Sequence, residues 1–326
     1  MAKRFFNLCL AVSICGLFSS VFAQMGWVLQ PSIIKGDLNA VYFTSPEKGW
    51  VAGDDGYLAS TNDGGRSWAK YALNTTENIN EIYFRNNDNG YIVAGKSIFV
   101  TRDGGRTWAE TRIYRDGEFG TAMPDFLSIR FTDKKRGYLV GSLFRRVGND
   151  ELVVDSLVML TTDGGDTWRR VSVPTKTELV HVDFDGNSRG WIVGHNGVVL
   201  ASSDEGNTWK QQLSGTAASL YNVDFRDKNE GYIVGSEGTI LRTENGGATW
   251  EKVTTNFRDT FLRVDFADDK NGWIVGRSGS ILRSSDKGKS WIRQESNTKS
   301  HLYGLFMAKK YGFAVGADGT VLQFTK

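Results

Sequence analysis

Six short segments of the 326-residue chain place an acidic or amide side chain in the same setting, which is the first pattern that could bind an ion. The segment 61–68 reads Thr-Asn-Asp-Gly-Gly-Arg-Ser-Trp, and its equivalents end at Trp108, Trp168, Trp209, Trp250 and Trp291. We call these segments Asp-boxes, and their acidic position holds Asp63, Asp103, Asp163, Asp204, Asn245 and Asp286. Ca²⁺ requires about six to eight oxygen ligands, whereas each box offers one carboxylate.

The box composition instead favours a structural role. Asp and Asn side chains accept hydrogen bonds from turn N–H groups, and Gly supplies positive φ angles. The Trp ring can then pack between the turn and the neighbouring sheet. We therefore predict that the boxes are framework and that the protein needs no metal or other cofactor.

The elements that carry the boxes follow from two further repeats. A Gly-aromatic-aliphatic motif begins at Gly49, Gly90, Gly137, Gly190, Gly231, Gly272 and Gly312, and an apolar run closes at Phe43, Phe84, Phe131, Phe184, Phe225, Phe266 and Phe306. Short β-branched runs at about ten-residue intervals, separated by turn signals, indicate strands. Four strands in a unit of about 41 residues, repeated seven times, predict an all-β, seven-bladed β-propeller with four antiparallel strands per blade.

The two ends of the chain explain how the ring closes. The chain stops where a seventh box would begin, and residues 26–30, Gly-Trp-Val-Leu-Gln, resemble residues 290–294, Ser-Trp-Ile-Arg-Gln. We predict that the N-terminal strand completes the last blade, which removes two exposed sheet edges.

The first 23 residues have the composition of a secretory signal peptide. Lys3 and Arg4 precede an apolar run, and Val21-Phe22-Ala23 forms a small-residue cleavage site. Both cysteines, Cys9 and Cys15, lie within this leader. Residues 24–326 are then a single domain without a disulfide and with 37 basic and 37 acidic residues. We expect an exported monomer, periplasmic or extracellular, without a membrane span and without affinity for nucleic acid.

Two insertions in the third unit are the first candidate for a binding site. About seven extra residues lie near 111–124 and about twelve near 143–156, and strand parity places both on the face opposite the boxes. Long insertions on one face of a repeat protein often carry binding. The candidates for partner contact are Arg112, Tyr114, Arg115, Phe144, Arg145 and Arg146, with Phe119 and Leu143 beside them. A solvated hairpin extension is the alternative.

A second candidate is a ring at the channel mouth. Three positions before each closing Phe stand Ala40, Glu81, Ser128, His181, Asn222, Arg263 and Tyr303. A position so polar and so varied does not merely fill identical space between blades, so we expect these residues at one level near the central channel. Hydrogen bonding that holds the ring together is the alternative explanation.

The whole of residues 26–326 resembles the photosystem II stability and assembly factor family. Six Asp-boxes such as 101–108, which look like those of bacterial neuraminidase repeats, carry the resemblance together with seven Gly-Trp/Tyr-Ile-Val-Gly strands. It implies a non-enzymatic propeller that binds protein partners during assembly of a membrane-protein complex, in the lumen if the organism is photosynthetic.

A carbohydrate-binding or sialidase-like glycosidase is the alternative function. Arg263, Tyr303 and Glu81 could imitate part of a sialidase site, but the Arg-Ile-Pro segment of those enzymes is absent. His181, His195 and His301 sit at unrelated points of their blades, and neither a nucleophile elbow nor a phosphate loop is present. We predict no catalytic residues.

Overall fold

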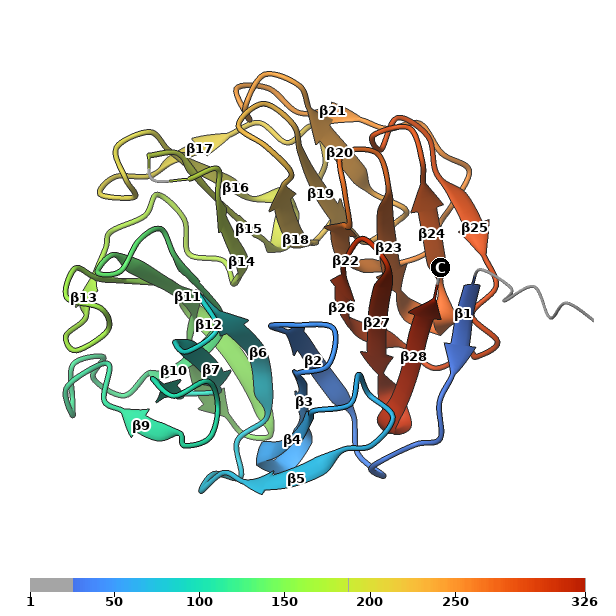
Figure 1. Cartoon of the computed structure of the whole chain (residues 1–326). Coiled ribbons are helices and arrows are strands. Elements are labelled where there is room, and N and C mark those ends of the chain that lie inside the picture. Colours follow the sequence, from blue (N-terminus) through green and yellow to red (C-terminus); the bar gives the residue numbers. More distant parts are fainter. Residues whose placement is uncertain (1–25, 187, 326) are drawn as a thin grey trace, which may run out of the picture.

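The computed structural model describes residues 26–186 and 188–325, and it forms a closed ring of seven four-stranded antiparallel sheets (Figure 1). The predicted leader lies outside these residues. Blades 1 to 3 consist of β2 (Leu38–Phe43), β3 (Gly49–Gly53), β4 (Tyr57–Thr61) and β5 (Ala69–Ala72); β6 (Ile79–Phe84), β7 (Gly90–Ala94), β8 (Ser97–Thr101) and β9 (Ala109–Thr111); and β10 (Met123–Phe131), β11 (Gly137–Val147), β12 (Asp150–Thr161) and β13 (Arg169–Arg170).

Blades 4 to 6 repeat the same order from the innermost to the outermost strand. They consist of β14 (Leu179–Phe184), β15 (Gly190–Gly194), β16 (Val199–Ser202) and β17 (Lys210–Gln212); β18 (Leu220–Phe225), β19 (Gly231–Gly235), β20 (Ile240–Thr243) and β21 (Glu251–Lys252); and β22 (Phe261–Phe266), β23 (Gly272–Gly276), β24 (Ile281–Ser284) and β25 (Ile292–Gln294). Single 3₁₀ turns follow four of the second strands: η1 (Asp54–Gly56), η2 (His195–Gly197), η3 (Arg277–Gly279) and η4 (Ala317–Gly319).

Blade 7 is built from both ends of the described chain, which confirms the predicted closure. It contains β26 (Leu302–Met307), β27 (Tyr311–Gly316), β28 (Thr320–Thr325) and, as its outermost strand, β1 (Gly26–Leu29). Strand β1 pairs antiparallel with β28, and Trp27 lies opposite Phe324 (Figure 1). The ring is therefore fastened by backbone hydrogen bonds between its two ends.

The hydrophobic core consists of layers between neighbouring blades. Each cluster of buried side chains joins adjacent sheets, as where Tyr138 and Val140 of blade 3 meet Leu179 and Val182 of blade 4. The closing Phe of one blade stacks on the second-strand aromatic residue of the blade before it, with ring centroids 4.3 Å apart for Phe84 on Trp50. Second strands such as β3 and β15 are buried along their whole length because they are covered on both faces.

In the six blades that carry one, the Asp-box contacts the previous blade of the ring. Gly105, at φ +80°, lies over Trp50, and a Cβ at this position would come within 2.7 Å of the indole. Both the positive φ and the close approach require glycine here. The box Trp108 packs edge-on against Phe84, with centroids 5.8 Å apart. The repeated Gly and Trp residues therefore shape the contacts between blades.

Candidate functional site

The Asp-boxes bind their own turns. Asp286 accepts hydrogen bonds from the Ser290 N–H at 3.0 Å, the Ser290 hydroxyl at 2.6 Å and the Ser284 hydroxyl at 2.8 Å. Asn245 accepts the equivalent N–H from Thr249 at 3.0 Å and donates its amide to the Thr249 hydroxyl. Hydrogen bonds from Ser67 and Thr61 lower the pKa of Asp63 to about 2. The remaining box residues, Asp103, Asp163 and Asp204, have the same pattern.

No three His, Cys, Asp or Glu side chains in residues 26–186 and 188–325 lie close enough together to hold a metal ion. Over the same residues, no helix is long and apolar enough to cross a membrane.

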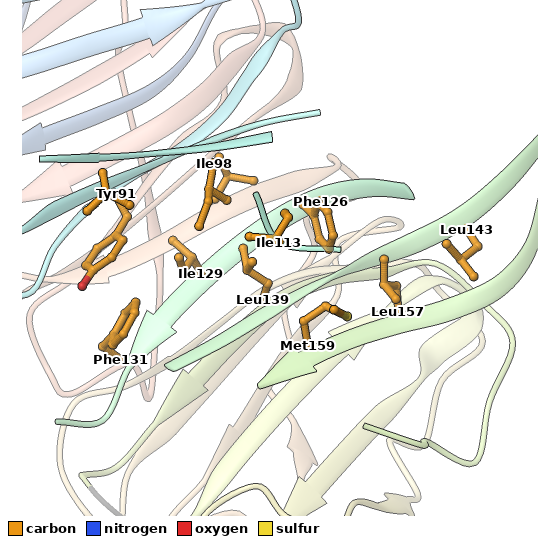
Figure 2. Packing of buried hydrophobic residues seen from close by; sticks show 12 residues of the cluster. Tyr91, Ile98, Ile113, Phe126, Ile129, Phe131, Leu139, Leu143, Leu157 and Met159 are labelled. Carbon is orange, nitrogen blue, oxygen red and sulfur yellow. The ribbon is translucent and has the colours of Figure 1, made fainter. Parts of the chain in front are cut away.

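The two insertions of blade 3 meet at their bases. Ile113 from the first insertion and Leu143 from the second are buried in one cluster with Phe126 and Leu157 (Figure 2). Tyr114 and Phe119 pack against this cluster and against each other, with ring centroids 5.3 Å apart. The aromatic candidates of the first insertion are therefore largely committed to packing, and they support the hairpin formed by β11 and β12.

The hairpin of β11 and β12 extends beyond the strands of every other blade. Its register continues to the pair Val147 and Asp150, which a two-residue turn with Gly148 at φ +66° connects. Val147 and Leu152 near the tip are 62% and 58% exposed. This length of ordered strand with exposed apolar residues at its end distinguishes blade 3.

Two of the candidate arginines, Arg145 and Arg146, lie on this hairpin, and Arg112 and Arg115 lie in the first insertion. Arg145 and Arg115 are exposed. Arg146 pairs with Glu151 across the hairpin at 3.2 Å, and Arg112 pairs with Asp116 at 3.0 Å, both in exposed positions. Such exposed pairs contribute little to stability, so these guanidinium groups can exchange their partners for others. Phe144 is half-buried.

A groove of about 570 Å³ runs along the hairpin base, and Phe144, Arg146, Met123 and Asp125 are among its lining residues. Burial, reinforced by the negative charges of Glu178, Glu151 and Glu77, raises the pKa of Asp125 to about 7. The carboxyl of Asp125 therefore changes its charge near neutral pH. Sequence reasoning missed Asp125, although it directly follows Pro124 at the end of the first insertion.

The predicted channel ring is mostly a set of contacts between blades. Glu81 accepts a hydrogen bond from the Ile129 N–H at 2.7 Å, Asn222 from the Val264 N–H at 3.0 Å, and Ser128 from the Val182 N–H at 3.4 Å. In each case the donor belongs to the next blade. These contacts agree with the alternative that the ring residues hold the blades together.

Arg130 of β10 contacts three of the titratable side chains that line the channel. Its guanidinium lies 2.5 Å from Glu81 Oε1, 3.7 Å from Asp183 Oδ1 and 3.2 Å from His181 Nε2, and it covers the ring of Tyr83. Burial opposes ionisation of Glu81, but Arg130 and His181 outweigh it and hold the pKa of Glu81 below its ordinary value. Burial and the charge of Arg130 lower the pKa of His181 to about 4, so this imidazole is neutral at pH 7.

A second position of the inner strands also places polar residues in the channel, and the predicted ring did not include it. The residue directly before the closing position is Tyr42, Tyr83, Arg130, Asp183, Asp224 and Asp265 in blades 1 to 6. In blade 7 it is Phe306, because Met307 is the residue that pairs with Gly312 there. Three aspartates at spacings of exactly one repeat are visible in the sequence. Two of them also join blades, since Asp183 accepts the Phe225 N–H at 2.8 Å and Asp265 accepts the Met307 N–H at 2.6 Å.

The structure does not place Tyr303 in the predicted channel ring. A bulge follows the first residue pair of blade 7 as it does in the other blades, and Gly304 pairs with Val315 in the position that His181 has in blade 4. Met307 pairs with Gly312 as Phe184 pairs with Gly190, because the turn to β27 is one residue shorter than the equivalent turn of blade 4. The closing residue of blade 7 is therefore Met307, not Phe306. The Tyr303 side chain contacts Asp37 and His301. The partial sialidase set is not assembled, because Glu81 and Arg263 line the channel while Tyr303 does not.

This fold and its boxes define the class of protein: a seven-bladed, all-β propeller of the Asp-box type. The chain belongs to the photosynthesis system II assembly factor YCF48 family, whose model matches residues 21–114, 67–142, 118–215, 210–300 and 255–325. This confirms the family expected from the repeats.

One curated relative and two solved structures show how far the similarity extends. The chain is 37% identical over 184 residues to the chloroplastic photosystem II stability/assembly factor HCF136 of Cyanidioschyzon merolae, a match covering 50% of this chain and 35% of that protein. The chain thus spans about a third of that relative.

A structure of YCF48 bound to D1 peptide has a TM-score of 0.72 and 19% identity, covering 92% of this chain and 97% of that one. Virginiamycin B lyase from Staphylococcus aureus with quinupristin has a TM-score of 0.73 and 10% identity, covering 92% and 99%. At these identities the similarity establishes the shared fold.

Proposed function

We propose that this protein is an exported, non-catalytic propeller that binds a protein partner through the extended hairpin of blade 3, during assembly or stabilisation of a membrane-protein complex. The observation that carries the proposal is the hairpin itself, an ordered pair of strands that presents Val147 and Leu152 to solvent. Exposed apolar residues flanked by arginines suit a protein interface, where aromatic, aliphatic and Arg side chains contribute most.

The family supports the assembly role. Its model bears the name of a photosystem II assembly factor, and the relative from Cyanidioschyzon merolae is a stability/assembly factor. The YCF48 structure with D1 peptide supports a polypeptide as the ligand of such a propeller. The leader-like first 23 residues support export.

The anchored base of the hairpin also supports binding. Leu143 is buried in a cluster against which Phe119 also packs, so the projecting strands start from a packed base. A pre-ordered surface loses less conformational entropy on association than a mobile loop does. A merely tolerated extension would not need the packing that the first insertion supplies.

Affinity capture tests the proposal. Replacing residues 144–154 by a Gly-Asn turn joins Leu143 to Asp155, which are already register partners, so the blade can close normally. We expect the specific partner to be lost with this variant and with Leu152→Glu. Ile292→Glu on β25, an equally exposed apolar position, is the matched control and should retain the partner. An unchanged set of captured proteins after shortening of the hairpin would contradict the proposal.

A further inference from the structure

A pocket of about 300 Å³ lies on the axis of the ring, and the inner strands of all seven blades line it. One wall is aromatic and comes from Tyr42, Tyr83 and Phe306 of blades 1, 2 and 7. The ring centroid of Tyr42 lies 5.5 Å from that of Phe306 and 6.4 Å from that of Tyr83. The facing wall carries Asp183, Asp224 and Asp265 of blades 4 to 6. No residue of the blade 3 hairpin lines this pocket, so it is separate from the proposed interface.

Most charges in the pocket already have partners. Arg130 binds Glu81 and Asp183, and Asp265 accepts the backbone N–H of Met307. A charged group that lacks such a partner in the protein is free to bind a ligand in the pocket.

Asp224 and Arg263 are the two unmatched charges. Within the described chain, Asp224 makes no hydrogen bond or ion pair, although Asp183 and Asp265 at the equivalent positions each accept one from the next blade. The Arg263 guanidinium donates one hydrogen bond, to the neighbouring Leu262 carbonyl, and pairs with no carboxylate among residues 26–186 and 188–325. His181 in the same pocket is 4% exposed, and its Nδ1 has no hydrogen-bond partner there.

The surroundings of the pocket disfavour the charged form of both groups. Burial and the negative charges of Asp265 and Asp183 raise the pKa of Asp224 well above its ordinary value. Burial likewise lowers the pKa of Arg263, against the favourable charge of Glu81. A group removed from water without a counter-charge is destabilised. Because Asp224 and Arg263 have opposite signs and do not pair with each other, a single guest that compensates both ionised groups carries both signs.

We propose that the axial pocket binds a small zwitterion of the amino-acid class, with its carboxylate on Arg263 and its ammonium group on Asp224. Arg presents a planar fork of donors that matches a carboxylate. Charge-assisted hydrogen bonds from the ammonium group then satisfy Asp224. The aromatic wall of Tyr42, Tyr83 and Phe306 covers the aliphatic part of the guest and favours the cation.

Isothermal titration with matched ligands tests the proposal. Glycine, 4-aminobutanoate and 6-aminohexanoate vary the separation of the two charges, whereas butylamine and butanoate each carry one charge on a chain of similar size. We expect at least one zwitterion to bind roughly tenfold or more tightly than both single-charge analogues, since each lost charged hydrogen bond costs about that factor or more.

Two pairs of variants complete the test. Asp224→Asn and Arg263→Gln should each abolish the preference for the zwitterion. Asp224 supports no hydrogen bond of the fold, so the Asn variant should remain folded, which its melting temperature verifies. Asp88→Asn and Arg106→Gln, both exposed, make the same charge changes elsewhere and should bind as wild type does. Equal binding of the single-charge analogues, binding of none of the zwitterions, or unchanged binding by Asp224→Asn and Arg263→Gln would overturn the proposal.

Discussion

Truncation of Trp27 should weaken the closure of the ring. This side chain of β1 is 5% exposed, lies 5.4 Å from the ring of Phe324 and donates a hydrogen bond from Nε1 to Gln294 Oε1 at 3.3 Å. It therefore joins the N-terminal strand both to blade 7 and to blade 6. Replacing a buried Trp by Ala costs about 3–5 kcal/mol, because apolar contact is lost and a cavity remains.

The expected shift in melting temperature follows from the size of the domain. An unfolding entropy of about 2.1 cal/mol/K per residue gives ~0.6 kcal/mol/K for about 300 residues, so each kcal/mol lowers the melting temperature by ~1.6 °C. Trp27→Ala should therefore lower it by about 5–8 °C. Differential scanning calorimetry measures this directly. Removal of residues 25–30 should have a larger effect and cause aggregation, because it exposes the edge of β28.

Val28→Ala is the matched control for Trp27→Ala. Val28 is the next residue of the same strand and is 49% exposed, so its truncation should change the melting temperature by less than about 1 °C. If Trp27→Ala melts like Val28→Ala, or if the protein without residues 25–30 is a soluble monomer with an unchanged melting temperature, the N-terminal strand does not close the ring.

Three further predictions concern single carboxylates. The pKa of Asp125 is raised from 3.8 to about 7, because its buried site favours the protonated carboxyl. The contribution of Asp125 to the free energy of unfolding is therefore complete below pH ~4 and is lost as the pH rises to ~7. Urea unfolding should show Asp125→Asn gaining stability over wild type across that window, by up to ~4 kcal/mol, and a difference independent of pH would refute this. Asp286→Ala should lower the free energy of unfolding by about 1 kcal/mol, measured by thermal unfolding. Asp286→Asn should lower it much less, because Asn245 accepts the equivalent hydrogen bond in blade 5. Equal losses for the two variants would contradict the role of Asp286 as a hydrogen-bond acceptor in its turn. Asp224→Asn without ligand should raise the melting temperature at pH 8 more than at pH 5, since its raised pKa makes the ionised form costly; a lower melting temperature at both values would show that the carboxylate supports the fold.

The blades and their closure could be predicted because a repeat gives several copies of each signal. A Gly at each second strand and the Gly and Trp residues of each box mark contacts that recur around the ring, as Gly90 against Phe84 and Gly105 against Trp50 show. The same averaging failed in blade 7. Phe306 lies six positions before Gly312, as the closing Phe does in the other repeats, but the turn between β26 and β27 is one residue shorter, so Met307 pairs with Gly312 and is the closing residue. The sequence cannot reveal a shift of one residue when the neighbouring residue has the side chain that is expected at the shifted position.

The candidate sites depended on contacts that cross between blades. One sequence shows that polar residues recur at a given position, but it does not show which residue of the next blade each of them contacts. Tyr114 was expected at a binding surface, yet it packs against the core of blade 3 because the first insertion folds back beneath the hairpin. Glu81 was identified as polar and variable, but its role depends on Arg130, which is 49 residues away in the chain. The unmatched charge of Asp224 emerged only when the equivalent aspartates of blades 4 and 6 could be compared in space.

Site-specific cross-linking from the hairpin tests the central claim most directly. A photo-reactive amino acid is placed at Leu152 on the blade 3 hairpin or at Ile292 on β25, two exposed apolar positions on different blades. The protein is then irradiated in the cells that produce it. We predict that position 152 yields a defined cross-linked protein product and that position 292 does not. A product from position 292 with none from position 152 would contradict binding through the hairpin.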